Sequence, residues 1–262
     1  MPEKLNTNEN SPAVIVARYT SSRLSWRPVL LFLSARLVFA FVAQGLVAGL
    51  FALGGSSDAW REAAGWWPVY STITDILCLL SLYWLMRREG LTLIDLFGVW
   101  GKPALRQLAW TPAYLLAVFP GPALAFAISQ MFYGSAPPPI FTIINLPPAG
   151  ALYAQIIWPA LWVVTEELVY LGYLLPRIEA WSGKTWIAVI VVIVFWGLQH
   201  LAIPWIADGT YLVWRGLSAS AAIILFPVVF VLWRRRLIPL IAIHYLADLS
   251  TALIATGVIP YR

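Results

Sequence analysis

Five ionisable side chains lie inside strongly apolar stretches of the second half of the chain. They are Glu166, Glu167, His200, His244 and Asp248, and both histidines of the chain belong to this set. A charged side chain at the centre of a membrane-spanning helix costs at least ~2.5–3.5 kcal/mol, so such residues usually face a cavity and mark a site. Carboxylates and imidazoles can act as general bases toward water, and they can also bind divalent metals. We therefore expect these side chains to carry chemistry.

Helical spacing predicts which of these groups can act together. Adjacent glutamates point about 100° apart on a helix, so only one of Glu166 and Glu167 can aim squarely at a given cavity. His244 and Asp248 are four residues apart and share one helix face, as Trp196 and His200 do. Counting from the nearest basic residues at about 1.5 Å per residue puts Glu166, His200 and His244 roughly 16, 24 and 12 Å deep. Tilted or kinked helices would bring these groups into one intramembrane site.

The composition predicts the helices that must position them. The chain has 262 residues, of which 61% are hydrophobic and 11% are charged. Soluble domains contain about 25% charged residues, and a helix needs about 20 mostly apolar residues to cross a membrane. We therefore predict an all-α fold, a polytopic integral membrane helical bundle of about seven transmembrane helices. The expected spans are Pro28–Leu53, Trp66–Met86, Leu108–Met131, Ala149–Pro176, Trp186–Ile203, Leu212–Trp233 and Leu237–Val258.

The basic residues alternate between loops, which predicts the orientation. The segment before the first span and the loops after the second, fourth and sixth spans hold 13 of the 17 Lys and Arg residues. The positive-inside rule then places the N-terminus in the cytoplasm and the C-terminus outside the cell membrane. We expect a cytoplasmic tail at residues 1–27 and a seven-span membrane domain at residues 28–262. The net charge of +5 is explained by this topology and gives no support for nucleic-acid binding.

Three motifs, in order along the chain, resemble those of the CPBP family of intramembrane proteases. That family includes the type 2 CAAX prenyl proteases and bacterial lysostaphin-resistance-like proteins. Its EExxxR, FxxxH and HxxxN patterns are similar to Glu166–Leu171, Trp196–His200 and His244–Asp248. Each motif alone is weak, but three in order inside apolar helices are specific. The resemblance covers residues 149–256, which we expect to be the catalytic core.

The resemblance implies an endopeptidase that hydrolyses a peptide bond of a membrane-associated substrate, prenylated or not. It implies that Glu166 and His200 activate the attacking water, that His244 and Asp248 stabilise the oxyanion, and that Glu167 supports the site. The expected partners are membrane lipid and a peptide or lipidated protein. This glutamate mechanism requires no cofactor. A divalent metal such as zinc, if bound, would take its ligands from Glu166, His200, His244 and Asp248.

The motifs depart from the family pattern at three positions. Trp196 replaces a phenylalanine and keeps an aromatic ring, Leu171 replaces the arginine, and Asp248 replaces the asparagine. An ionised aspartate cannot donate a hydrogen bond to an oxyanion, although a protonated one can, so Asp248 could instead orient His244. We hypothesise that Arg36 in the first span supplies the missing cation near Glu167. Asp75 in the second span competes as its partner.

Other interpretations of the same residues stay open. A family member with reduced catalysis could act as a membrane partner, as in bacteriocin immunity, and the changes at Leu171 and Asp248 keep this alternative open. Buried acids and histidines also form proton relays in transporters. Against transport, the sequence shows no pair of similar halves, which many carriers have. Arg215, near the outer end of the sixth span, is expected to be interfacial.

Overall fold

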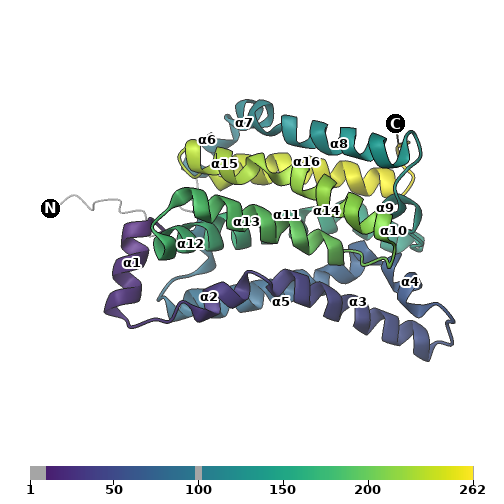
Figure 1. Ribbon diagram of the computed structural model, residues 1–262, viewed down its shortest axis with the longest axis horizontal. Coiled ribbons are helices and arrows are strands. Elements are labelled where there is room, and N and C mark those ends of the chain that lie inside the picture. Colours follow the sequence, from purple (N-terminus) through teal and green to yellow (C-terminus); the bar gives the residue numbers. More distant parts are fainter. Residues whose placement is uncertain (1–9, 98–101, 262) are drawn as a thin grey trace.

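The structure, a computed structural model, describes residues 10–97 and 102–261. Within these residues it consists of helices joined by turns, with no strand. The long helices run side by side along the longest axis of the molecule (Figure 1). The all-α bundle that the composition predicts is therefore confirmed. Residues 1–9 of the predicted tail, and Gly98 to Gly101 of the loop after the second span, lie outside the described part of the chain.

Among the described residues, six segments are long and apolar enough to cross a membrane. They are Ala35–Leu53 (α3), Trp67–Arg88 (α5), Thr111–Tyr133 (α7, Thr111–Val118, and α8, Pro120–Tyr133), Thr185–Ala202 (α13, Thr185–Gln199, and a 3-10 turn, His200–Ala202), Gly209–Leu232 (α14, Gly209–Ile223, and α15, Leu225–Leu232) and Leu237–Ala255 (α16). Shorter helices connect them: α1 (Pro12–Ser21), α2 (Arg27–Phe32), a 3-10 turn (Leu93–Phe97), α4 (Ala59–Ala64), α6 (Lys102–Leu108) and α9 (Pro139–Thr142). The six candidate membrane-spanning segments agree closely with the predicted number of about seven.

The remaining predicted span is divided into shorter pieces. It contains α10 (Pro148–Ile156), α11 (Trp158–Glu167), a π-helical segment (Leu168–Leu174) and the start of α12 (Leu175–Ser182). Pro159 begins α11, where its missing N–H costs no helical hydrogen bond. The π-helical segment follows Glu167 directly, and such segments are rare and often lie at functional sites. The helix with the paired glutamates is thus the least regular one in the bundle.

The position of α11 makes it the centre of the bundle. It packs against α5 on one side and α16 on the other, and Figure 1 shows it between these two groups of helices. Every residue of the π-helical segment that follows it is buried. A Cβ atom added at Gly172 would lie 3.4 Å from Leu96 and from Leu237, an ordinary van der Waals contact, so the segment packs directly against these neighbours. The paired glutamates are therefore enclosed on all sides by other helices.

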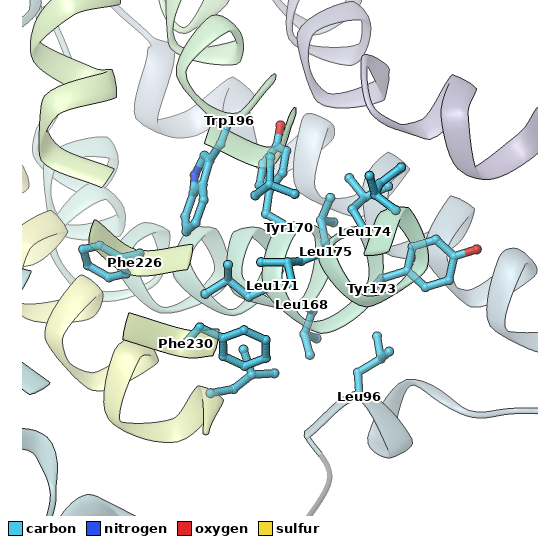
Figure 2. Packing of buried hydrophobic residues seen from close by; sticks show 14 of the residues in the cluster. Leu96, Leu168, Tyr170, Leu171, Tyr173, Leu174, Leu175, Trp196, Phe226 and Phe230 are labelled. Carbon is cyan, nitrogen blue, oxygen red and sulfur yellow. The ribbon is translucent and has the colours of Figure 1, made fainter. Parts of the chain in front are cut away.

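Two apolar clusters flank the polar side chains of α11. The first surrounds the π-helical segment and includes Leu171, Trp196 and Phe226, as Figure 2 shows. The second, toward α9 and α10, contains aromatic side chains such as Trp158 and Trp214. Leu171, which stands where the family motif has arginine, is completely buried in the first cluster. This position is an apolar packing site here, and a cation there would have no water to solvate it.

The outer surface of the bundle is apolar, as expected for contact with lipid. Leu53, Leu116 and Met131 are 87%, 77% and 82% exposed. Exposed apolar surface of this extent marks a membrane or protein contact. The helices α1, α6 and α12 lie at one end of the long axis, and α4, α9 and α10 lie at the other (Figure 1). The chain is therefore a multi-pass membrane protein.

A buried ion pair fastens the N-terminal helix to the bundle. Arg177 of α12 donates to Glu89 at 2.6 and 2.8 Å, and to the Oδ1 atom of Asn10 at 2.7 Å. Glu89, which follows α5, also accepts from Tyr19 at 2.9 Å and from Arg18 at 3.3 Å. Burial by itself raises the pKa of Glu89, but the hydrogen bonds and charge of Arg177 outweigh it and lower that pKa below 4.5. Burial, together with Glu89, raises the pKa of Tyr19 to about 12.

We predict that Arg177→Met destabilises the protein by about 3–5 kcal/mol, because it leaves the carboxylate of Glu89 buried without a partner. Arg106→Met, which removes an exposed arginine from α6, is the matched control and should have little effect. The measurement is the free energy of unfolding in detergent. The folded pKa of Glu89 is lowered, so its stabilisation is present above pH 4.5 and is lost as the pH falls through the folded pKa. Equal stability of the two variants at pH 7 would contradict this role.

Candidate functional site

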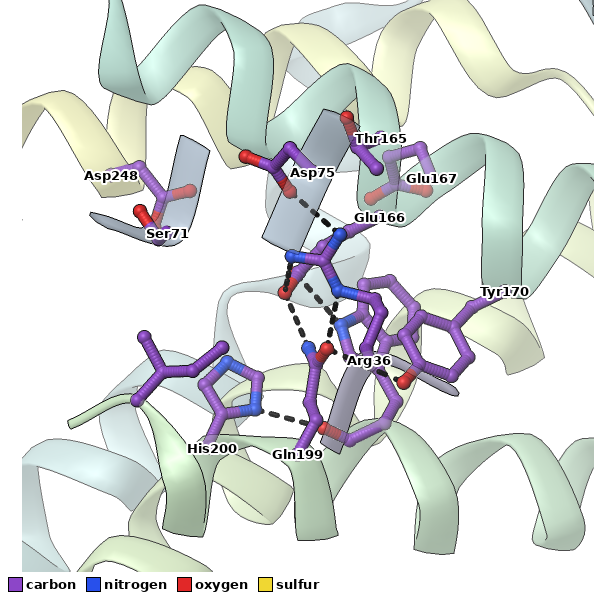
Figure 3. Close-up of polar contacts among 12 residues, drawn as sticks. Arg36, Ser71, Asp75, Thr165, Glu166, Glu167, Tyr170, Gln199, His200 and Asp248 are labelled. Carbon is purple, nitrogen blue, oxygen red and sulfur yellow. Dashed lines mark hydrogen bonds and ion pairs between the residues drawn. The ribbon is translucent and has the colours of Figure 1, made fainter. Parts of the chain in front are cut away.

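Glu166 is the centre of a layer of polar side chains that includes Arg36, Asp75 and Gln199 (Figure 3). Its side chain is fully buried at the end of α11. Its Oε1 atom accepts a hydrogen bond from Gln199 and another from Arg36 at 3.4 Å. Its Oε2 atom accepts from the indole N–H of Trp196 at 2.8 Å and lies 3.6 Å from Nε2 of His244. Both carboxylate oxygens are thus held by donors from other helices, which fixes the orientation of the group.

Arg36 of α3 supplies the cation of this layer. Its side chain is fully buried and donates to Asp75 of α5 at 2.7 Å and to Gln199 at 2.5 Å. The guanidinium also lies over the ring of Trp162, 4.5 Å from its centroid. The sequence predicted that Asp75 and a site glutamate compete for Arg36, and the structure shows that it contacts both. The glutamate is Glu166, however, and not Glu167 as we expected.

His244 of α16 lies between the paired glutamates. Its Nδ1 atom is 3.1 Å from Glu167, and its Nε2 atom is 3.6 Å from Glu166 and 3.5 Å from Asp248. Adjacent glutamates point in different directions, as the helical spacing predicts, yet both reach this ring because its two nitrogens lie on different edges. Ionised carboxylates only accept hydrogen bonds, so both nitrogens can donate to them at once only as an imidazolium.

His200 lies where α13 ends in its short 3-10 turn. Its Nδ1 atom is 2.8 Å from the backbone oxygen of Trp196, four residues earlier. A carbonyl oxygen can only accept, so Nδ1 carries the proton and donates. In the neutral ring, Nε2 is then left with its lone pair. Within the described residues, His200 makes neither a hydrogen bond nor an ion pair with Glu166.

A cavity of about 360 Å³ opens beside the polar layer. Its polar wall contains His200, His244, Asp248 and Arg215, and its other walls are mostly apolar, with many aromatic side chains. The aromatic side chains are Trp67, Phe126, Phe141, Trp158, Trp162, Trp214, Phe226 and Tyr261. Pockets of about 300–1,000 Å³ with apolar walls and a few convergent polar groups are typical of ligand sites. Glu166, Glu167 and Arg36 do not line this cavity but lie behind its polar wall.

The structure therefore brings all the predicted site residues into one region, divided between two positions. His200, His244 and Asp248 face the cavity, and the two glutamates and Arg36 form the support behind it. Whether each group has its predicted catalytic role stays a prediction.

Three contributors were missed or misjudged from sequence. Gln199 bonds both Arg36 and Glu166, and a glutamine next to His200 in an apolar helix is the signal that could have found it. Trp196 was expected to provide only an aromatic ring, yet its indole N–H bonds Glu166. Arg215 was expected at the membrane interface, but it is partly buried and lines the cavity.

A metal could take its ligands from the same carboxylates and histidines. In the part of the chain that the structure describes, however, no group of three or more His, Cys, Asp or Glu side chains is placed to hold a metal ion. The carboxylate of Glu166 contacts the N–H donors of neighbouring side chains and His244. His200 instead bonds the backbone of Trp196. The set of four ligands predicted for a bound metal is thus not assembled here. Metal dependence stays open to experiment.

Comparison with known families agrees with this geometry. Residues 145–250 match the family model described as type II CAAX prenyl endopeptidase, Rce1-like. The matched residues include both glutamates, both histidines and Asp248, whereas Arg36 and Asp75 lie outside them. Searches of curated proteins and of solved structures found no match. Residues 145–250 are therefore similar to an Rce1-like domain of the type II CAAX prenyl endopeptidase kind, which confirms the resemblance of this part of the chain to the CPBP family of intramembrane proteases.

Proposed function

We propose that this protein is an intramembrane endopeptidase that hydrolyses a peptide bond of a membrane-associated substrate, prenylated or not. One observation carries the proposal: His200, with Nε2 free to accept a proton, lines the same cavity as His244 and Asp248. The match to a family of endopeptidases supports it. The aromatic walls of the cavity suit an apolar peptide or lipid group.

His200 is the group that takes the proton from water in this proposal. Its Nε2 atom is the basic nitrogen, because Nδ1 donates to the backbone of Trp196. The same Trp196 donates its indole N–H to Glu166, so one residue ties the base to the buried carboxylate. Glu166 then contributes a fixed negative charge, which favours the imidazolium that forms when His200 accepts the proton. The two residues that the resemblance implies for water activation thus act together, with the proton on His200.

His244 is the electrophilic group. It lines the cavity, and as an imidazolium its Nε2–H can donate to the oxygen of the scissile carbonyl. Glu167 holds the opposite edge of the ring at 3.1 Å, which fixes its orientation. Asp248, 3.5 Å from Nε2, balances the positive charge of the ring. Preorganised donors of this kind stabilise the tetrahedral intermediate of acyl transfer.

The proposal includes the orientation in the cell membrane, with the N-terminus in the cytoplasm and the C-terminus outside. The arrangement of the helices supports it. Arg177 lies in α12, and Arg235 forms an ion pair with Glu179 of the same helix. From this end of the bundle α16 runs to the opposite end (Figure 1). Lipid and a peptide or lipidated protein are the partners that this membrane enzyme would meet.

A second candidate function rests on the complete burial of Glu166. Its side chain has no exposed surface, and the donors of Arg36, Gln199 and Trp196 already occupy it. A carboxylate so engaged could serve only to hold helices together. The chain would then be a membrane partner with reduced catalysis, and the polar layer would be structural.

We predict that His200→Ala lowers kcat/KM by about 10²–10⁴-fold, the usual contribution of a general base. Glu166→Gln should also lower kcat, because the charge that favours the imidazolium of His200 is lost. The measurement is cleavage by purified protein of a panel of prenylated and plain membrane peptides. Ser250→Ala, an exposed position on α16, is the control and should leave cleavage unchanged. Normal cleavage by His200→Ala would exclude His200 as the base, and absence of cleavage by the wild-type protein would exclude the hydrolase proposal. A biological phenotype that survives both variants would favour the membrane partner.

Trp196→Phe restores the ring that the family motif has, but it removes the indole donor to Glu166. A hydrogen bond to a charged group contributes about 1.5–3 kcal/mol, so we expect kcat/KM to fall by about ten- to a hundredfold. The backbone bond that fixes His200 should survive, and KM should change little. An unchanged kcat would show that the indole N–H has no part in the site.

Chelation tests the metal-free form of the mechanism. We expect dialysis against a strong chelator to leave cleavage unchanged, because the proton-accepting and electrophilic groups are imidazoles of the chain. Loss of activity that returns on addition of zinc alone would show instead that the predicted ligands assemble around a metal.

A further inference from the structure

Arg215 places a positive charge at the wall of the cavity. It lies on α14, and its Nε and Nη2 atoms donate to the backbone oxygens of His200 and Ile203, each at 3.2 Å. These carbonyls belong to the end of α13 and its 3-10 turn, where the helix dipole favours a cation. The two hydrogen bonds fix the plane of the guanidinium. They also tie it to the backbone of His200 itself.

The bonds to the two backbone oxygens use Nε and Nη2 and leave the third nitrogen, Nη1, outside them. Among the described residues the side chain of Tyr211 also forms a hydrogen bond with the guanidinium, but no carboxylate lies within ion-pair distance of it. Arg215 lines the cavity together with His200, His244 and Asp248. A cation facing a largely apolar cavity needs an anionic or strongly polar partner there. A bound molecule with a negative charge would supply that partner.

The site lacks a second hydrogen-bond donor for an oxyanion when Asp248 is ionised. In its ionised form Asp248 only accepts hydrogen bonds, so it then cannot donate to an oxyanion as an amide at the same position could. Its Oδ2 atom is buried without a hydrogen-bond partner and lies 3.5 Å from His244. His244 then provides one donor toward the cavity, and a tetrahedral oxyanion is commonly held by more than one.

We propose that Arg215 supplies the second donor, from Nη1, to the oxyanion of the tetrahedral intermediate. This role rests on the proposed endopeptidase function. The oxygen of water bonds to the scissile carbon while its proton passes to Nε2 of His200, and the π electrons of the carbonyl move onto its oxygen. That oxyanion accepts from Arg215 and His244. When it collapses, the C–N bond breaks and His200 returns the proton to the leaving amine.

A hydrogen bond connects the proposed donor, Arg215, to the backbone of the proposed base, His200. Arg215 bonds the carbonyl oxygen of the residue whose side chain is the base, so donor and base keep a fixed relation when the helices shift. Such preorganisation is what gives oxyanion donors their large effect, because no reorganisation is needed during the reaction.

The test compares Arg215→Gln and Arg215→Lys with Arg106→Gln, which changes an exposed arginine on α6. We expect Arg215→Gln to lower kcat by about 10²–10³-fold with little change in KM, and Arg215→Lys to lose less because it keeps the charge. Asp248→Asn, combined with Arg215→Gln, should restore part of kcat by supplying an amide donor. Thermal unfolding of each variant identifies any loss of fold.

Binding gives a second readout that does not depend on turnover. A phosphinic peptide carries an anionic tetrahedral centre, and its neutral ketomethylene counterpart does not. Arg215→Gln should weaken binding of the phosphinic peptide by about 10²-fold or more and leave the ketomethylene peptide unaffected. Equal losses for both peptides would indicate a structural role and overturn the proposal.

Other outcomes separate this proposal from the proposed function. Cleavage by the wild-type protein with an unchanged kcat in Arg215→Gln overturns the role of Arg215 alone. An effect confined to KM, and absent when the peptide ends in an amide, would show that Arg215 binds a substrate carboxylate instead. If the wild-type protein cleaves no peptide and shows no preference for the phosphinic form, both proposals fail.

Discussion

The structure depends on how the carboxylate of Glu166 is held in an apolar interior. An isolated buried charge is very costly, and only close donors and a counter-charge offset that cost. Arg36, Gln199, Trp196 and His244 provide them from α3, α13 and α16. Asp75 then balances Arg36. The hydrogen bonds and ion pairs around this one carboxylate therefore connect five helices: α3, α5, α11, α13 and α16.

That constraint also explains why the cavity lies where it does. The charged groups that satisfy one another, Glu166, Arg36 and Asp75, are completely buried between the helices. The imidazoles of His200 and His244 retain a small exposed fraction, 8% and 7%, at the cavity wall. The structure thus separates a rigid electrostatic support from the groups that can exchange protons with a bound molecule. Precise placement of such groups on packed helices is what catalysis by fixed donors requires.

The departures from the family motif become intelligible in this arrangement. The arginine position is occupied by Leu171, which packs in an apolar cluster, and a cation enters instead from α3 as Arg36. The tryptophan that replaces phenylalanine adds a donor to Glu166. Arg36 and Trp196 both contact Glu166, although the cation was expected beside Glu167. A residue distant in sequence thus places a cation beside Glu166, because a buried charge responds to spatial neighbours regardless of their place in the chain.

The sequence by itself determined the class of the fold, most of the spans and the set of candidate residues. Apolar runs of sufficient length can only be helices in a membrane, and ionisable residues inside them are too costly to be accidental. Only the tertiary structure decided which carboxylate Arg36 contacts, that His244 lies between Glu166 and Glu167, and that Arg215 faces the cavity. Helical periodicity gives the face on which a residue lies but not the tilt and offset between helices. Those depend on packing between segments far apart in the chain, such as Arg36 and Glu166, which are 130 residues apart.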